Sequence, residues 1–552
     1  MGERATMTAW RACFFLTLAL AAAVYAGSLD GGWVWDDPVL VSGEAIGGGR
    51  SVVECLARPF LGSYFRPLVS LTFFAERRLF GESPAGYRLV NLALHVGATA
   101  CTMGLALAAL RRRAAAIVAG LLFAVQPAQV GAVAWIGGLT DGLAAFWTAA
   151  WAGLLVAGVR RASAPRAARV PDRSSADGSA LAMHAGAVAC YTAMVLSKEQ
   201  MAAALPLVPF AWHAFRPAGR RSLSDAAFGT LPYLAATAVF AAMWWFVARP
   251  PAMGPPVHLP GPAVLAGQSV AYYALMLAAP APRWMHTLSE GFARGAPLGW
   301  AALGWTVAAG SALLWLRWLR RWREGAWLLA FVWLSLLPVL NVVALPYVLL
   351  APYRAACGGV AFAVLAAGGL GRLRGRARAR LCLRRAAGRR VRAVVATVLV
   401  VWWGALTAWG ATRWRSEEAW FGEVVRHDPQ SVVARYMLAR THLMEGRWAE
   451  GAALLEEVLD YLLGRGAWRL PDRAASAVRD PVVVSRIQRS RGFPEDPRAF
   501  STQVLTLVGW ARLQLGEWRE AAQSYRAALA VTPGHAAARV GLEAAEARRE
   551  AP

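Results

Sequence analysis

The chain alternates long apolar segments with short polar loops over its first 412 residues, and a charged region follows. Several apolar segments reach about 20 residues, the length that an α-helix needs to cross the hydrocarbon core of a bilayer. They are longer and more continuous than the alternating strands of a membrane β-barrel. The pattern therefore predicts an all-α, polytopic membrane protein with a polar C-terminal domain.

We expect about eleven membrane-spanning helices. A further apolar stretch, residues 263–279, contains Gln268, Ser269 and a pair of tyrosines, so we interpret it as an interfacial or re-entrant helix. The predicted spans are 10–26, 87–109, 114–135, 139–158, 182–196, 200–215, 227–247, 297–316, 325–345, 353–371 and 393–412.

The formal net charge of +25 is concentrated in arginine-rich loops between the apolar segments. With a cytoplasmic N-terminus, every strongly basic loop falls on the inner side, as the positive-inside rule requires. The charge therefore indicates orientation in a membrane, and we expect no nucleic-acid partner. The high content of Arg, Ala and Trp is compatible with a bacterial source, which predicts an inner-membrane protein. The basic loops are 111–113, 160–173, 216–221, 317–323 and 372–392.

An odd number of spans leaves everything after residue 412 outside, which in a bacterium is the periplasm. Residues 432–459 and 502–533 share a helix–turn–helix pattern, and the second copy fits a tetratricopeptide repeat of roughly 34 residues. We expect these repeats to bind a protein partner, although they could instead pack against the external loops. The segment 464–500 between them is a loop or a linker. The matching positions are Gly509, Gly516, Trp518, Ala521, Tyr525, Ala528 and Pro533.

The predicted organisation is therefore a transmembrane domain over 1–412, with a first external loop at 27–86, and an external repeat domain over 413–552. Polar side chains collect near the external ends of the predicted spans. Ionisable groups in such places cost a few kcal/mol and usually face a cavity or a partner. Taken singly, each has a simpler explanation, such as a loop acid, a helix cap or a surface ion pair. The set comprises Asp36, Asp37, Arg66, Arg88, Asn91, His95, Gln126, Gln129, Asp141, Lys198, Glu199 and Arg354.

Together, these groups predict one polar cavity on the external side. Arginines at a membrane surface suit a lipid-linked phosphate, which a guanidinium can bind through two parallel hydrogen bonds. A carboxylate beside aromatic rings suits a hydroxyl acceptor, from which it can remove a proton. The combination favours transfer of a sugar from a polyprenyl-phosphate carrier. A transporter is less favoured, because the sequence lacks a matching pair of interrupted helices.

Six motifs occur in an order that resembles the transmembrane and tetratricopeptide-repeat proteins, an O-mannosyltransferase-like family with the C-type glycosyltransferase fold. The resemblance implies a catalytic base in the first external loop, at Asp36 or Asp37, and donor-phosphate contacts from Arg66, Lys198 and Arg354. The motifs are WVWDDPVLV, SYFRPLVSLTF, LFGESPAGYRLVNLALH, LLFAVQPAQVGAVAWIGGLTDGLA, LSKEQMAAALPL and LLPVLNVVALPYVLLAPYR. Residues expected to shape the site are Trp35, Arg88, Asn91, His95, Gln126, Gln129, Asp141 and Glu199.

One motif departs from the family pattern. Where members commonly read HPxHxEAVAWISGRxD, this chain has Gln126, Gln129, Gly131 and Leu139 in place of two histidines, a glutamate and an arginine. We expect an active but divergent enzyme. The sequence indicates no certain cofactor and leaves open whether the enzyme uses a divalent metal.

Three hypotheses follow from the sequence. The first is a glycosyltransferase that acts on a protein or glycan hydroxyl. The second is a membrane-anchored repeat scaffold with a degenerate transferase domain. The third is a transporter of a lipid-linked sugar.

Overall fold

The structure is a computed structural model of the 552-residue chain. It describes residues 2–41, 51–60, 64–163, 173–217, 219, 222–248, 261–285, 298–342, 350–380, 385–428, 431–463 and 497–550. Within these ranges all regular secondary structure is helical, apart from an isolated bridge between Phe60 and Tyr64. The all-α fold predicted from the apolar periodicity is confirmed.

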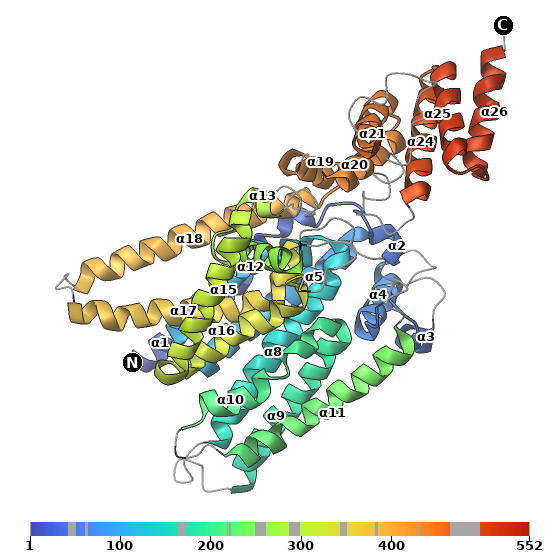
Figure 1. Cartoon of the computed structure of the whole chain (residues 1–552). Coiled ribbons are helices and arrows are strands. Elements are labelled where there is room, and N and C mark those ends of the chain that lie inside the picture. The colour runs from blue at the N-terminus through green and yellow to red at the C-terminus, as the bar shows by residue number, and fades with distance from the viewer. Residues whose placement is uncertain are drawn as a thin grey trace.

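The helices of the first 413 residues form a membrane bundle and a loop region between α1 and α5, which we call the first loop (Figure 1). They are α1 (Gly2–Ala23), α2 (Asp37–Val41), α3 (Val52–Ala57), α4 (Pro67–Phe80), α5 (Pro84–Leu110), α6 (Arg113–Ala124), α7 (Val130–Ala134), α8 (Leu139–Ala162), α9 (Arg173–Ser197), α10 (Leu207–Phe215), α11 (Leu223–Val247), α12 (Pro262–Ala278), α13 (Pro282–Met285), α15 (Leu298–Arg321), α16 (Arg323–Leu336), α17 (Ala356–Arg380) and α18 (Arg385–Arg413). Short 3-10 turns join several of them: η1 (Ala26–Ser28), η2 (Pro127–Gln129), η3 (Ile136–Gly138), η5 (Glu199–Ala204), η7 (Leu337–Val339) and η8 (Pro352–Ala355).

Seven helices in the described part of the chain are long and apolar enough to span a membrane, or eight if a bent pair is one span. The pair joins Arg113–Ala124 to Pro127–Ala134 at 50°. The protein is thus an integral membrane protein, and these helices, with the bent pair counted as one span, coincide with eight of the eleven spans that we predicted.

Proline interrupts two of the other predicted spans. The predicted span 200–215 is divided at Pro206 into η5 and the short α10, and 325–345 is interrupted at Pro338 after α16. Proline lacks the N–H that continues the helical hydrogen bonds, and its ring clashes with the preceding turn. The predicted span 393–412 lies within the 29-residue helix α18.

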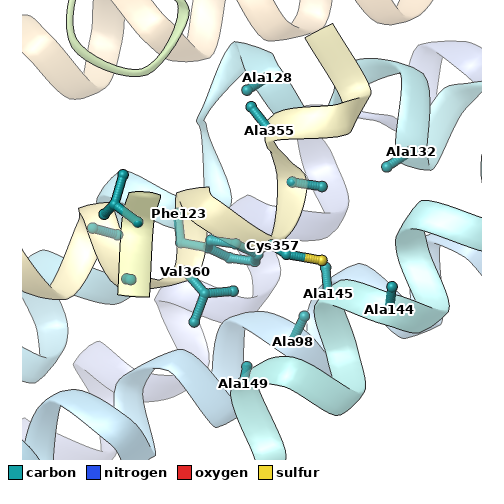
Figure 2. Packing of buried hydrophobic residues seen from close by; sticks show 14 of the residues in the cluster. Ala98, Phe123, Ala128, Ala132, Ala144, Ala145, Ala149, Ala355, Cys357 and Val360 are labelled. Atoms are coloured by element: carbon teal, nitrogen blue, oxygen red, sulfur yellow. The ribbon is translucent and has the colours of Figure 1, made fainter. Parts of the chain in front are cut away.

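Small side chains fill the centre of the bundle where α5, α6, α8 and α17 meet. Figure 2 shows alanines of α5 and α8 facing Cys357 and Val360 of α17, with Phe123 of α6 between them. Small residues allow membrane helices to approach closely without a hydrophobic driving force between them. The same principle applies where α12 crosses α15, because a Cβ on Gly304 would lie 1.7 Å from the carbonyl oxygen of Gly267. Helix α12 has 17 residues, is buried on most sides and is shorter than a span.

Large apolar side chains cover the outside of the bundle, as expected of helices that face lipid. Phe15 on α1, Phe228 and Phe246 on α11, and Leu313 on α15 are each more than 60% exposed. Exposed apolar surface of this extent is typical of membrane contact.

The C-terminal helices lie together beyond one end of the bundle (Figure 1). They are α19 (Glu417–His427), α20 (Val432–Met444), α21 (Trp448–Leu463), α24 (Pro497–Gln514), α25 (Trp518–Val531) and α26 (Ala536–Glu550). Gly446 and Gly516 adopt left-handed φ angles of 79° and 81° at the turns of the two helix pairs, a conformation in which a side chain is strained. Of the predicted segment 464–500, residues 464–496 lie outside the described residues, and α24 begins at Pro497.

Candidate functional site

A cavity of about 820 Å³, lined by charged and aromatic side chains, opens between the first loop and the ends of several membrane helices. Charged residues reach it from helix termini. Arg66 precedes α4, whose first position is Pro67, and Asp141 lies in the first turn of α8. Lys198 and Glu199 follow the end of α9, and Arg354 lies in η8. Seven predicted site residues therefore line one cavity: Trp35, Asp36, Arg66, Asp141, Lys198, Glu199 and Arg354.

Asp36 is half-buried and lines the cavity. Burial raises the pKa of its carboxyl group to about 6. A carboxylate with a pKa near the operating pH is well suited to accept a proton from a reacting hydroxyl.

The neighbouring Asp37 is fully buried and does not line the cavity. Its Oδ2 accepts a hydrogen bond of 2.9 Å from the backbone N–H of Val34, and its Oδ1 accepts one of 2.9 Å from that of Gly137. Burial raises its pKa to about 7, against the opposing effects of these two donors and of Arg88. Asp37 therefore connects the first loop to the turn before α8, whereas Asp36 faces the cavity.

Trp35 has a left-handed backbone, with φ at 59°, which is unusual for a bulky side chain. The backbone N–H of Trp35 donates to Oε1 of Glu417 in α19 at 3.2 Å. Its ring stacks on that of Trp135 at 5.4 Å, Trp135 on Trp414 at 5.3 Å, and Trp414 on Trp420 at 3.7 Å. We call these four rings the tryptophan column. It extends from the wall of the cavity to the first helix after the membrane bundle.

Arg88 is buried in α5 and lies outside the cavity. Its guanidinium donates to four backbone carbonyls, those of Gly31, Gly32, Ala134 and Trp414, the last at 2.9 Å. It therefore holds the first loop against α7 and the end of α18. This is a positioning role for a residue that we expected to shape the site.

Two of the three cations of the cavity are paired with carboxylates. Arg66 donates through Nε and Nη2 to the two carboxylate oxygens of Glu199, at 2.8 and 2.7 Å. Its guanidinium also lies 4.2 Å from the centre of the Tyr64 ring. Burial tends to raise the pKa of the Glu199 carboxyl group. The positive charge of Arg66 has the larger, opposite effect, so this pKa lies below its ordinary value. Lys198 forms a buried salt bridge with Asp141.

Four further predicted site residues, Asn91, His95, Gln126 and Gln129, are buried, and three of them bind the backbone of neighbouring segments. Asn91 donates to the carbonyl of Trp135 at 2.9 Å, and a His95 ring nitrogen lies 3.1 Å from that of Ala124. Gln129 donates to the carbonyl of Ala356 at 3.1 Å and lies 3.5 Å from Gln126. None of the four lines the cavity.

The sequence did not single out several other residues of the cavity. Tyr64 contacts Arg66, and Trp135 and Tyr353 add aromatic walls. Tyr64 and Trp135 lie in the same sequence motifs as Arg66 and Asp141. That closeness in sequence could have indicated that the two aromatic residues belong to the site. Glu417 had no such signal, because it lies 382 residues from Trp35 in a region that we interpreted as a separate domain. Within the described residues, no group of three His, Cys, Asp or Glu side chains is placed to hold a metal ion.

The fold and the cavity define an integral membrane protein with a polar site at one end of its helical bundle. No protein-family model matches the chain. Residues of the chain are similar to the protein O-mannosyl-transferase Tmtc1 of Drosophila melanogaster, with 36% identity over 134 residues. They are also similar to Tmtc2 of the same organism, with 32% identity over 140 residues. The resemblance predicted from the motifs is thereby confirmed.

These matches cover 22% and 23% of this chain, and only 16% and 15% of the two relatives. The chain also shows a likeness to the crystal structure of the oligosaccharyltransferase from Archaeoglobus fulgidus in its apo form. The TM-score is 0.42 with 16% sequence identity, over 73% of this chain and 56% of that one.

Proposed function

We propose that the protein is a membrane glycosyltransferase of the C-type kind. It moves a sugar from a polyprenyl-phosphate carrier to a hydroxyl group of a protein or glycan. The observation that carries the proposal is the cavity itself, in which a half-buried Asp36, aromatic walls and three cations surround one space. The similarity to proteins named O-mannosyl-transferases supports the same class of reaction.

In the proposed reaction, the oxygen of the acceptor hydroxyl attacks the anomeric carbon of the sugar. Asp36 accepts the proton of that hydroxyl during the attack. The bond from that carbon to the phosphate oxygen breaks on the opposite face, so the configuration inverts and the polyprenyl phosphate leaves. Asp37 and Arg88 hold the loop so that Asp36 faces the cavity. The chemistry requires no redox step.

Arg66 and Arg354 are the cations that we assign to the donor phosphate. Glu199 occupies Nε and Nη2 of Arg66, so the remaining Nη1 edge can donate to a phosphate oxygen in a fixed orientation. Lys198 is buried against Asp141, so its charge contributes more to the fold of the cavity than to a ligand. Three cations balance three carboxylates in the cavity lining, so the donor does not enter a strongly positive site.

The cavity faces the exterior in this proposal, and the N-terminus is cytoplasmic. Arginines gather at the opposite end of the bundle, where Arg112, Arg317 and Arg321 line a second pocket. The positive-inside rule puts that end in the cytoplasm. The acceptor would then reach the cavity from the side of the repeat domain, which is the surface best suited to bind a protein partner.

Sealed vesicles that contain the purified protein, a radiolabelled polyprenyl-phosphate sugar and an added acceptor peptide rich in serine and threonine test this function. A transferase produces a labelled protein or glycan acceptor. A transporter moves the label across the membrane without a product, and a scaffold does neither. Absence of product with mannose, glucose and N-acetylglucosamine donors, while repeat-domain partners still bind, would contradict the proposal and favour the scaffold.

A further inference from the structure

A second pocket, of about 750 Å³, lies at the end of the bundle away from the candidate site. Helix α17 connects the two regions, because it begins after Arg354 at the first cavity and passes Arg372 at the second pocket. Between Ala356 and Arg372 the helix rises roughly 24 Å at about 1.5 Å per residue. The pocket is therefore close to the opposite membrane surface and separate from the proposed chemistry.

The walls of this pocket come from the ends of five helices. Ala109 and Leu110 end α5, Arg112 precedes α6, and the last turns of α15 face the start of α16 and the middle of α17. Four arginines line it, whereas Glu324 is its one carboxylate. Glu324 is itself 3.8 Å from Arg160, so the charge available to a ligand is strongly positive. The four are Arg112, Arg317, Arg321 and Arg372.

Two tryptophans give the pocket a defined shape. The rings of Trp318 and Trp322 contact each other edge to face at 4.8 Å. The guanidinium of Arg372 lies 4.4 Å from the centre of the Trp322 ring, so this arginine is oriented as well as charged. Gly368 of α17 makes room for Trp322, because a Cβ there would lie 2.9 Å from the indole. The pocket is thus built by packing and is not only a row of surface arginines.

The surroundings are apolar on the lipid side. Leu314 lines the pocket and is 38% exposed, and on the same helix Leu313 and Leu316 are 68% and 56% exposed. Acyl chains can therefore lie along α15 while a headgroup occupies the pocket. Tryptophan and arginine at this depth are typical of residues that contact lipid headgroups.

We propose that this pocket binds the headgroup of an anionic phospholipid from the inner leaflet, preferably one that carries two phosphates. Guanidinium groups bind phosphate oxygens through paired hydrogen bonds, and basic pockets between membrane helices suit such headgroups. The continuous apolar face of α15 favours a lipid over a soluble phosphate compound. Because α16 and α17 both border the pocket, the bound lipid would hold the two helices together at this end.

Native mass spectrometry of the full-length protein in detergent tests the proposal, with titration of diphosphatidylglycerol, phosphatidylglycerol and phosphatidylcholine. The wild type should bind the first two and show little affinity for the third. The double variant Arg317→Gln with Arg321→Gln should bind diphosphatidylglycerol on the order of tenfold more weakly. Arg320→Gln is the matched control, because Arg320 lies in the same turn of α15 but does not line the pocket.

A charge-retaining variant, Arg317→Lys with Arg321→Lys, separates lost binding from lost folding, and it should recover part of the affinity. Inorganic phosphate and glycerol phosphate serve as soluble competitors. Competition at micromolar concentrations would show a site for a free phosphate and overturn the lipid assignment. Equal binding by the glutamine variant and by Arg320→Gln would also overturn the proposal. It does not depend on transferase activity, so it can fail or succeed independently.

Discussion

At the scale of single residues, two adjacent aspartates have different environments. Asp36 faces the cavity, whereas both oxygens of Asp37 accept backbone N–H groups from separate parts of the chain. The sequence could locate the pair but could not divide the roles, because the division depends on Gly137 and the turn before α8. The distinction makes the two residues separable by experiment.

Replacement of Asp37 by alanine should lower stability. It leaves the N–H groups of Val34 and Gly137 without their acceptor, which costs about 1–3 kcal/mol for each buried group that finds no new partner. The thermal unfolding midpoint of the purified protein measures this. Asp36→Ala removes neither bond and should leave the midpoint unchanged. An equal loss of stability in both variants would argue against separate roles.

The pH dependence of transfer should report Asp36. Burial raises the pKa of its carboxyl group to about 6, and a general base acts only in its ionised form. The ionised fraction increases as the pH rises through the pKa, so kcat/KM should increase about tenfold per pH unit below about 6 and level off above it. Steady-state rates between pH 4.5 and 8 measure the profile. A flat profile over this range would contradict Asp36 as the base.

The departures from the family motif are also residue-scale features. The position of the family's glutamate is Gly131, where a Cβ would lie 2.8 Å from the ring of Tyr353. Gln126 and Gln129 pack against Gly359 of α17, where a Cβ would meet the Gln126 amide oxygen at 2.2 Å. Neutral amides and an aromatic ring therefore occupy this space, and Asp141 is the ionisable group that this motif contributes to the cavity.

At the scale of secondary-structure elements, α19 contacts the loop that bears Asp36. The Glu417 carboxylate accepts the Trp35 N–H at 3.2 Å through one oxygen and the Thr441 hydroxyl of α20 at 2.9 Å through the other. Gly32 donates to the carbonyl of Arg415 at 2.8 Å. These bonds and the tryptophan column connect the repeat helices to the residue that precedes Asp36.

Glu417→Gln should therefore impair catalysis without a change at the cavity itself. The variant weakens a bond that keeps Trp35 in its left-handed conformation, so kcat should fall roughly tenfold while the KM for the donor changes little. Glu418→Gln is the control, because Glu418 pairs with Arg447 on the surface. Steady-state kinetics of both variants test this coupling. A fall in kcat of the same size in the control would show a general effect of the repeat domain.

At the scale of the whole molecule, the sequence was sufficient to predict an all-α membrane protein, a helical C-terminal region and seven residues of one cavity. That success rests on local signals, since Lys198 and Arg354 lie at the ends of predicted spans, and Asp36 and Arg66 lie in the loop between the first two predicted spans. Helix interruptions at Pro206 and Pro338 were not anticipated, because apolar composition alone does not locate a break. The pairing of Arg66 with Glu199 and the contact of Glu417 depend on tertiary structure, so no local pattern could indicate them.

The central claim is that Asp36 removes the acceptor proton in the cavity. Its most direct test is the single-turnover rate of sugar transfer by Asp36→Asn, measured together with the affinity for a polyprenyl-phosphate sugar. The account predicts a rate about 10²–10⁴ times lower than in the wild type, with donor affinity and unfolding midpoint unchanged. A rate within threefold of the wild type would contradict it.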